Sequence, residues 1–252
     1  MLFAGPAIAD ARFNAIPWTR PTTVVVVPCL GADCATVAPR GSDGRILPAL
    51  VQKATGKPLD AWESILLSAF SAGGRLLNEI AQVPADLDRV VGLTLHDASF
   101  GESLAGQRGA AAQALLGRKL FVATNTNNGS PLTPLTARQS IERVVLGAQA
   151  DTGVALQALS ARPPMPAPSG GVTGAGALAW YDYVKPGASP NSGNDLEHVD
   201  HNYLAAKVWE AYAVPALAGT LPMASSGGWS ATLGLGMLAL AGAWYFTSRR
   251  SP

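Results

Sequence analysis

The chain has 252 residues, of which 48% are hydrophobic and 14% are charged. This length suffices for one sizeable core and at most two ordinary domains, and the apolar content excludes a disordered chain. Eighteen basic residues against seventeen acidic ones leave a formal net charge of +1, so we expect no nucleic-acid partner. The small charged fraction favours a segment that contacts lipid.

The first nine residues, Met1–Ala9, are apolar and end in Ala7-Ile8-Ala9, a small-x-small pattern typical of signal-peptide cleavage sites. No basic residue precedes them, and the run is short for a complete signal peptide. The segment is therefore either an apolar arm or the end of a leader that starts upstream. We assign residues 1–20 to an N-terminal arm.

Residues 21–222 alternate between strand-like and helix-like segments. The strand-like segments are short apolar or β-branched runs, and the helix-like segments carry apolar residues at helical spacing. The expected strands are Thr22–Val27, Glu63–Ala69, Asp88–Leu95, Lys119–Thr124 and Ala177–Val184. The expected helices are Arg45–Ala54, Gly74–Gln82, Thr136–Ala148 and His201–Tyr212. This alternation predicts an α/β domain with a mainly parallel sheet sandwiched by helices.

Two further segments, Gly101–Leu116 and Arg162–Gly176, are rich in small residues, glycine or proline. We expect both to be long loops that shape the mouth of a pocket. Cys29 and Cys34 either close one small disulfide loop in an oxidising compartment or remain two thiols beside a strand end.

The segment Trp229–Phe246 has eighteen residues with neither charge nor proline. As a helix it would span about 27 Å, which is close to the hydrocarbon thickness of a bilayer. Trp229 at one end, and Trp244 with Tyr245 at the other, suit the two membrane interfaces. The alternative is a buried core helix.

Arg249 and Arg250 follow this segment, so the positive-inside rule predicts a cytoplasmic tail. We therefore expect a linker at residues 223–228, a transmembrane helix at 229–247 and a short basic tail at 248–252. The protein would then be a single-pass membrane protein with a C-terminal anchor. The side of the membrane on which the domain lies stays open.

The stretch Ser68–Gly74 (SAFSAGG) lies where an expected strand runs directly into an expected helix. A serine in such a turn is held in a strained conformation that small neighbours permit, and its hydroxyl projects from the sheet. Ala69 and Gly73 supply small residues two positions before and after Ser71. Ala69 replaces the first glycine of the G-x-S-x-G pattern. The alternative is a structural turn serine.

This layout resembles the α/β-hydrolase family between Thr22 and Leu217, and the AFSAGG elbow carries the resemblance. The resemblance implies Ser71 as the nucleophile of a serine esterase or lipase. It also implies the chain order nucleophile, acid, base for the catalytic triad. No cofactor and no metal are implied. The expected substrate is a small-molecule or lipid-like ester. An amide is the second candidate.

The family's usual acid position corresponds to Thr124–Asn128, which holds no carboxylate. Asp97 ends the preceding expected strand, where some family members carry the acid, so it is the candidate. The resemblance places the base in the loop after the last strand. His201 is the candidate there and His198 the alternative, while His96 is expected to pack in or beside its strand.

The resemblance implies two backbone amides that hold the oxyanion. The amide of Ala72, directly after the nucleophile, is one of them. The other would come from the turn after the first expected strand, at Leu30 or Cys29, although the His-Gly pair common in that turn is absent.

Two other interpretations stay open. The loop between the last expected strand and the last expected helix carries groups that could instead bind a divalent metal. These are Asp195, Glu197, His198, Asp200 and His201. The domain could also be an inactive hydrolase-like scaffold that binds a partner or glycan at a membrane surface.

Overall fold

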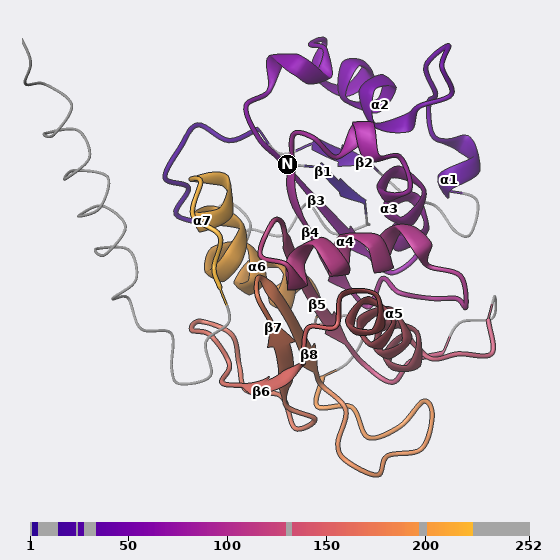
Figure 1. The fold of residues 1–252 in the computed structure, drawn as a ribbon, viewed down its shortest axis with the longest axis vertical. Coiled ribbons are helices and arrows are strands. Elements are labelled where there is room, and N and C mark those ends of the chain that lie inside the picture. Colours follow the sequence, from indigo (N-terminus) through magenta and orange to yellow (C-terminus); the bar gives the residue numbers. More distant parts are fainter. Residues whose placement is uncertain are drawn as a thin grey trace, which may run out of the picture.

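The computed structural model describes residues 2–4, 15–23, 25–27, 34–129, 133–196 and 201–223. These residues form an eight-stranded sheet with helices on both of its faces (Figure 1). The expected α/β class and the mainly parallel sheet are confirmed. The expected transmembrane segment lies outside the described residues, and the helices within them are all too short or too polar to cross a bilayer.

The strands follow the order β2-β1-β3-β4-β5-β8-β7-β6 across the sheet. The first six in this order are mutually parallel, and β7 pairs antiparallel with both β8 and β6. Parallel strands share one carboxyl edge, so their C-terminal residues gather on the same side of the molecule. The strands are β1 (Leu2–Ala4), β2 (Val25–Val27), β3 (Ile65–Phe70), β4 (Val90–His96), β5 (Leu120–Asn125), β6 (Gln157–Leu159), β7 (Val172–Ala175) and β8 (Leu178–Asp182).

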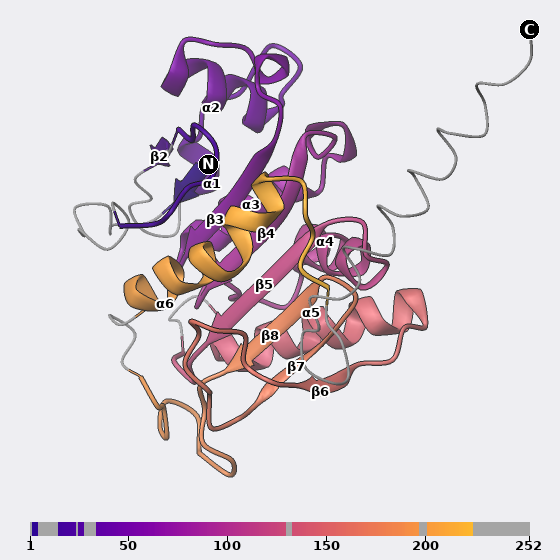
Figure 2. The ribbon, with the colours of Figure 1, turned by 90° about the vertical axis from the view of Figure 1, so that its left-hand side faces the viewer.

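Most of the longer helices cover one face of the sheet, and the C-terminal helices cover the other (Figures 1 and 2). The first group contains α2 (Ile46–Thr55), α3 (Gly73–Ala81), α4 (Ala105–Leu115) and α5 (Ala137–Thr152). The second group is one continuous helical run of α6 (His201–Val208), the π-helical turn η5 (Trp209–Ala213) and α7 (Val214–Leu217). The short elements are α1 (Cys34–Val37), η2 (Leu59–Ala61) and η3 (Pro84–Asp86).

The central strands are buried on both faces, which explains why their sequences are continuously apolar. In β3, Leu67 and Ala69 pack under α2 and α3, while Leu66 and Phe70 pack under the C-terminal helices. The same alternation holds in β4, β5 and β8. The sheet therefore separates two hydrophobic cores, one on each face. The ends of the strands lie at the edges of the sheet, between these cores.

Local signals predict the best-defined helices correctly. Thr136 accepts a hydrogen bond from the Gln139 N–H (3.2 Å), and Gln139 Oε1 accepts one from the Thr136 N–H (2.9 Å). This capping box fixes the start of α5. Gly56, with φ of 70°, ends α2 in the left-handed conformation that glycine favours.

Two expected loops contain regular structure. Gly101–Leu116 was expected to be a loop but contains α4, because its alanines are strong helix formers and its small side chains allow close packing. A Cβ on Gly106 would lie 2.0 Å from the Asn78 carbonyl oxygen. Arg162–Gly176 was expected to be a loop but contains β7, whose backbone is satisfied by antiparallel pairing with β8.

The N-terminal residues contribute to the domain. Leu2–Ala4 forms β1 between β2 and β3, although the sequence analysis placed residues 1–20 in an arm. Farther along, Ile16 is buried, and the ring of Trp18 packs against Trp209 with centroids 6.2 Å apart. Three residues are too few to give a readable strand pattern, which is why the sequence does not reveal β1.

Candidate active site

Ser71 and Asp97 follow directly on the neighbouring strands β3 and β4 at the carboxyl edge. Both have positive φ angles, 50° for Ser71 and 48° for Asp97. Among the described non-glycine residues, Asn191 alone shares this feature. Such conformations cost about 1–3 kcal/mol each and cluster at functional sites. The backbone strain that the sequence predicts for Ser71 is therefore present, and Asp97 shares it.

The backbone around Ser71 forms a tight turn between β3 and α3. The Ser71 N–H donates to the His96 carbonyl (3.1 Å), and the Gly74 N–H donates to the Ser71 carbonyl (3.0 Å). The side chain of Ser71 is half-buried, in contrast to the fully buried strand before it. Ser71 is thus partly accessible at the end of β3.

Gly74 brings the turn after Ser71 into direct contact with the segment after Asp97. A Cβ on Gly74 would lie 1.5 Å from the carbonyl oxygen of Ala98, so no other residue fits without movement. The buried Gln107 amide joins the same two segments, donating to the Gly74 carbonyl (3.1 Å) and the Ala98 carbonyl (3.3 Å). These contacts fix Ser71 and Asp97 relative to each other.

The Asp97 carboxylate is buried and held by the segment after β5. Its Oδ1 accepts from the Thr126 N–H (2.7 Å), and its Oδ2 accepts from the Thr126 hydroxyl. Asp97 and Thr126 are 1% and 0% exposed. Donors to the ionised form favour that form, so this arrangement suits a charged carboxylate.

His96 packs within the sheet, as the sequence analysis expects. It is fully buried, and its Nδ1 lies 3.1 Å from the hydroxyl of Thr124 on β5. Its side chain is on the face of the sheet that α6 covers, because it alternates with Leu95 on the opposite face.

The C-terminal helical run is set against β3 by a buried hydrogen bond. The indole N–H of Trp209 donates to Ser68 Oγ (3.1 Å), which also accepts from the Thr94 hydroxyl (2.8 Å).

The helix α6 packs across β4 and β5 (Figure 2). The backbone of His201 begins this helix. The side chain of His201 and the whole of His198 lie outside the described residues. The structure therefore places Ser71 and Asp97 after adjacent strands, while neither candidate imidazole lies within the described part of the chain.

The Ala72 amide lies at the start of α3, where first-turn N–H groups have no helical partner. Within the described chain, the Ala72 amide donates to no backbone carbonyl. Cys29 and Leu30 fall outside the described residues. The strand before them, β2, is separated from β3 by β1.

The loop that could hold a metal is described only in part. Asp195 accepts from both the N–H and the hydroxyl of Ser169 (2.7 Å each), so its carboxylate has a structural role. No group of three potential metal ligands occurs among the described residues. Glu197, His198 and Asp200 lie outside them.

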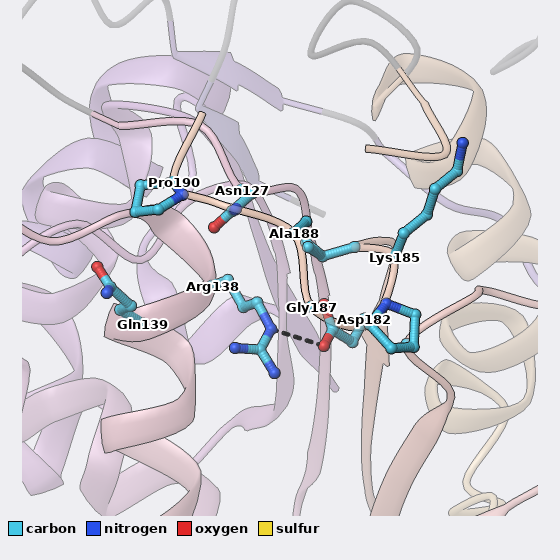
Figure 3. Close-up of a pocket in the computed structure, with 11 residues that line it drawn as sticks. Asn127, Arg138, Gln139, Asp182, Lys185, Gly187, Ala188 and Pro190 are labelled. Atoms are coloured by element: carbon cyan, nitrogen blue, oxygen red, sulfur yellow. Dashed lines mark hydrogen bonds and ion pairs between the residues drawn. The ribbon is translucent and has the colours of Figure 1, made fainter. Parts of the chain in front are cut away.

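The sequence analysis missed one buried charged cluster at the same edge. Asp182 ends β8, and its Oδ2 accepts from Arg138 Nε (2.8 Å), while its Oδ1 accepts from Asn125 Nδ2 (3.0 Å). The hydrogen bond to Asp182 raises the pKa of the Arg138 guanidinium. Asp182 and Arg138 line a cavity of about 390 Å³ (Figure 3). The signal in the sequence is a carboxylate at a strand end, the same signal that pointed to Asp97.

Comparison of the chain with protein-family models, with curated proteins and with solved structures gave no match.

Proposed function

We propose that this protein is a serine hydrolase that cleaves an ester, or less favourably an amide, by acyl transfer. Ser71 is the nucleophile, His201 the general base and Asp97 the acid that orients it. The observation that carries the proposal is the pair of positive φ angles at Ser71 and Asp97 on adjacent strand ends. Strain of this kind persists only where the surrounding structure enforces it.

In the proposed mechanism, Ser71 Oγ attacks the carbonyl carbon of the substrate while the His201 imidazole takes the hydroxyl proton. The tetrahedral intermediate collapses, the bond to the leaving group breaks, and His201 returns the proton to the leaving alcohol. Water then attacks the acyl-enzyme by the same route and releases the acid. The Ala72 amide and a second amide, for which Leu30 is the candidate, stabilise the oxyanion.

Three features of the described chain support this assignment. The half-buried Ser71 directly precedes Ala72, the N-cap of α3, whose N-terminal amides favour a developing negative charge. The buried Asp97 carboxylate has its orientation fixed by Thr126. The helix α6, which begins at His201, packs across β4, the strand that Asp97 follows. A mainly parallel sheet with a serine in a strand–turn–helix is also what membership of the α/β-hydrolase family would require.

We further propose that residues 229–247 anchor the domain to a membrane as a single C-terminal helix. The uncharged run with aromatic residues at both ends carries this part of the proposal. The full chain is expected in the membrane fraction, and a chain ending at Gly228 in the soluble fraction. Recovery of the full chain in the soluble fraction would contradict the anchor.

Hydrolysis of p-nitrophenyl esters of increasing acyl length tests the activity. The wild type is expected to turn over at least one ester, and Ser71→Ala should reduce kcat/KM by about 10⁴-fold or more. Ser103→Ala, at an exposed serine, is the matched control and should behave as wild type. A folded wild type that hydrolyses no ester would favour the non-enzymatic scaffold instead.

A further inference from the structure

A second site lies at the same edge of the sheet, three strands away from Ser71. The cavity of about 390 Å³ is lined by the ends of β5 and β8, the first turn of α5 and the loop after β8 (Figure 3). Neighbouring strands are about 4.8 Å apart, so β8 lies about 14 Å from β3. This volume falls in the range of pockets that hold small molecules.

Asp182 orients Arg138 by accepting a hydrogen bond from Nε, and it leaves the two terminal nitrogens of the guanidinium available. Arg138 Nε donates to Asp182 Oδ2, and Asp182 Oδ1 is occupied by Asn125. The terminal nitrogens of Arg138 make no hydrogen bond within the described chain. Their single ion pair there is with Glu142, at 3.8 Å. The Arg138 side chain is 36% exposed, against 8% for Asp182. Arg138 thus presents a fixed fork of N–H donors.

The other polar groups of the cavity are mostly donors as well. Gln139 uses its amide oxygen in the capping box with Thr136, so its amide nitrogen is left over. The Lys185 ammonium is exposed and forms no ion pair with a described carboxylate. Asn127 provides the one acceptor of this set, its amide oxygen, because its nitrogen donates to the Ser189 carbonyl (2.6 Å).

We propose that this cavity binds a small carboxylate anion, with its two oxygens on the guanidinium of Arg138. Unused donors predominate, and both oxygens of Asp182 are already bonded, so an anion is the complementary ligand. A planar guanidinium with a free edge matches the two oxygens of a carboxylate. The amide nitrogen of Gln139 supplies an additional donor. The site goes beyond the proposed hydrolase activity, because it needs neither Ser71 nor a reaction.

Isothermal titration calorimetry of the full chain with acetate, succinate and inorganic phosphate, at constant ionic strength, tests the proposal. Saturable binding of acetate or succinate is expected. Arg138→Lys keeps a positive charge beside Asp182 but loses the fork, and should weaken binding by about tenfold.

Gln139→Glu is the decisive variant. Glutamate preserves the capping box and suits a helix N-terminus, so the thermal midpoint should not fall. The substitution replaces the donor with a negative charge and should weaken carboxylate binding by about tenfold or more. Glu142→Gln removes a competing carboxylate near Arg138 and should strengthen binding. Arg143→Gln, at an exposed arginine of the same helix outside the cavity, is the control and should not change binding.

Three results would overturn the proposal: no saturable carboxylate binding by the wild type, wild-type affinity in Gln139→Glu, or binding of phosphate without binding of either carboxylate. Because the experiment measures equilibrium binding, none of these results would contradict the proposed hydrolase reaction at Ser71.

Discussion

Thr126 donates to both carboxylate oxygens of Asp97, from its backbone N–H to Oδ1 at 2.7 Å and from its hydroxyl to Oδ2. One residue of the segment after β5 thereby fixes the rotation of a side chain at the end of β4. Since both residues are buried, water cannot readily replace the hydroxyl. Thr126 is therefore a positioning residue for the proposed acid.

Thr126→Val removes the hydroxyl donor while preserving side-chain shape. It should lower kcat for ester hydrolysis by about tenfold with little change in KM, since one charge-assisted hydrogen bond is lost. A carboxylate with one donor fewer should stabilise the imidazolium of the proposed base more strongly, so the acidic limb of the pH–rate profile should move to higher pH. Thr126→Ser should restore both properties. Wild-type kcat and pH profile in Thr126→Val would refute this role.

Gly74→Ala should be strongly destabilising, because the added Cβ would lie 1.5 Å from the Ala98 carbonyl oxygen. Overpacking against backbone costs about 1–3 kcal/mol or more. Gly109→Ala in α4 is the matched control: nothing lies within 4 Å of its Cβ, and alanine in a helix should add about 0.5–1 kcal/mol. Urea unfolding of both variants measures the contrast. Equal stability of the two would contradict the close approach of α3 to the segment after β4.

The Trp209–Ser68 hydrogen bond is predicted to set the position of α6 on the sheet. Trp209→Phe leaves the buried Ser68 hydroxyl with one partner fewer and should cost about 1–3 kcal/mol of unfolding free energy. In Ser68→Ala the indole N–H loses its acceptor instead. A double-mutant cycle should give a coupling energy of about 1 kcal/mol. Additive effects of the two substitutions would show that this bond does not hold the helix.

Three buried tyrosines predict loss of stability at alkaline pH. Burial raises the pKa of the Tyr181, Tyr183 and Tyr212 phenols above their ordinary value. A group whose folded pKa is raised stabilises the fold fully below its unfolded pKa, about 10 for tyrosine, and loses that contribution at higher pH. Unfolding free energy should therefore fall above pH 10, as measured by urea titration at increasing pH.

Tyr212→Phe removes one of these phenols and should make the alkaline fall shallower, although it also removes the Tyr181–Tyr212 hydrogen bond (2.6 Å). Tyr203→Phe, at an exposed tyrosine, is the control and should change the slope much less than Tyr212→Phe. An identical pH dependence in wild type and Tyr212→Phe would show that burial of this phenol does not govern the alkaline transition.

Much of the fold can be predicted from the sequence because local and tertiary signals agree. In α2, for example, Ile46, Leu47, Leu50 and Val51 are the expected apolar face and are all buried. The helix α4 escapes prediction because its buried face is mostly alanine and glycine. Their role becomes visible only through contacts such as that of Gly106 with Asn78. Pairing of β7 with β8 is likewise a property of the sheet rather than of the VTGA sequence.

The candidate site likewise combines residues that the sequence predicts with contacts that only the folded sheet creates. Ser71 and Asp97 are found from sequence because each directly follows a readable strand, where α/β sheets place functional groups. The Thr126 contact with Asp97 cannot be read from sequence, since it depends on the adjacency of β4 and β5. The pair of Arg138 and Asp182, 44 residues apart, similarly requires β5 and β8 to be neighbours.

The most direct measurement for the central claim is mass spectrometry of the full chain after reaction with a fluorophosphonate probe. The account predicts one covalent adduct, located on the peptide that contains Ser71. The adduct should be absent in Ser71→Ala and greatly reduced in His201→Ala. A folded wild type that forms no adduct, or an adduct that persists in Ser71→Ala, would contradict the assignment of Ser71 as nucleophile.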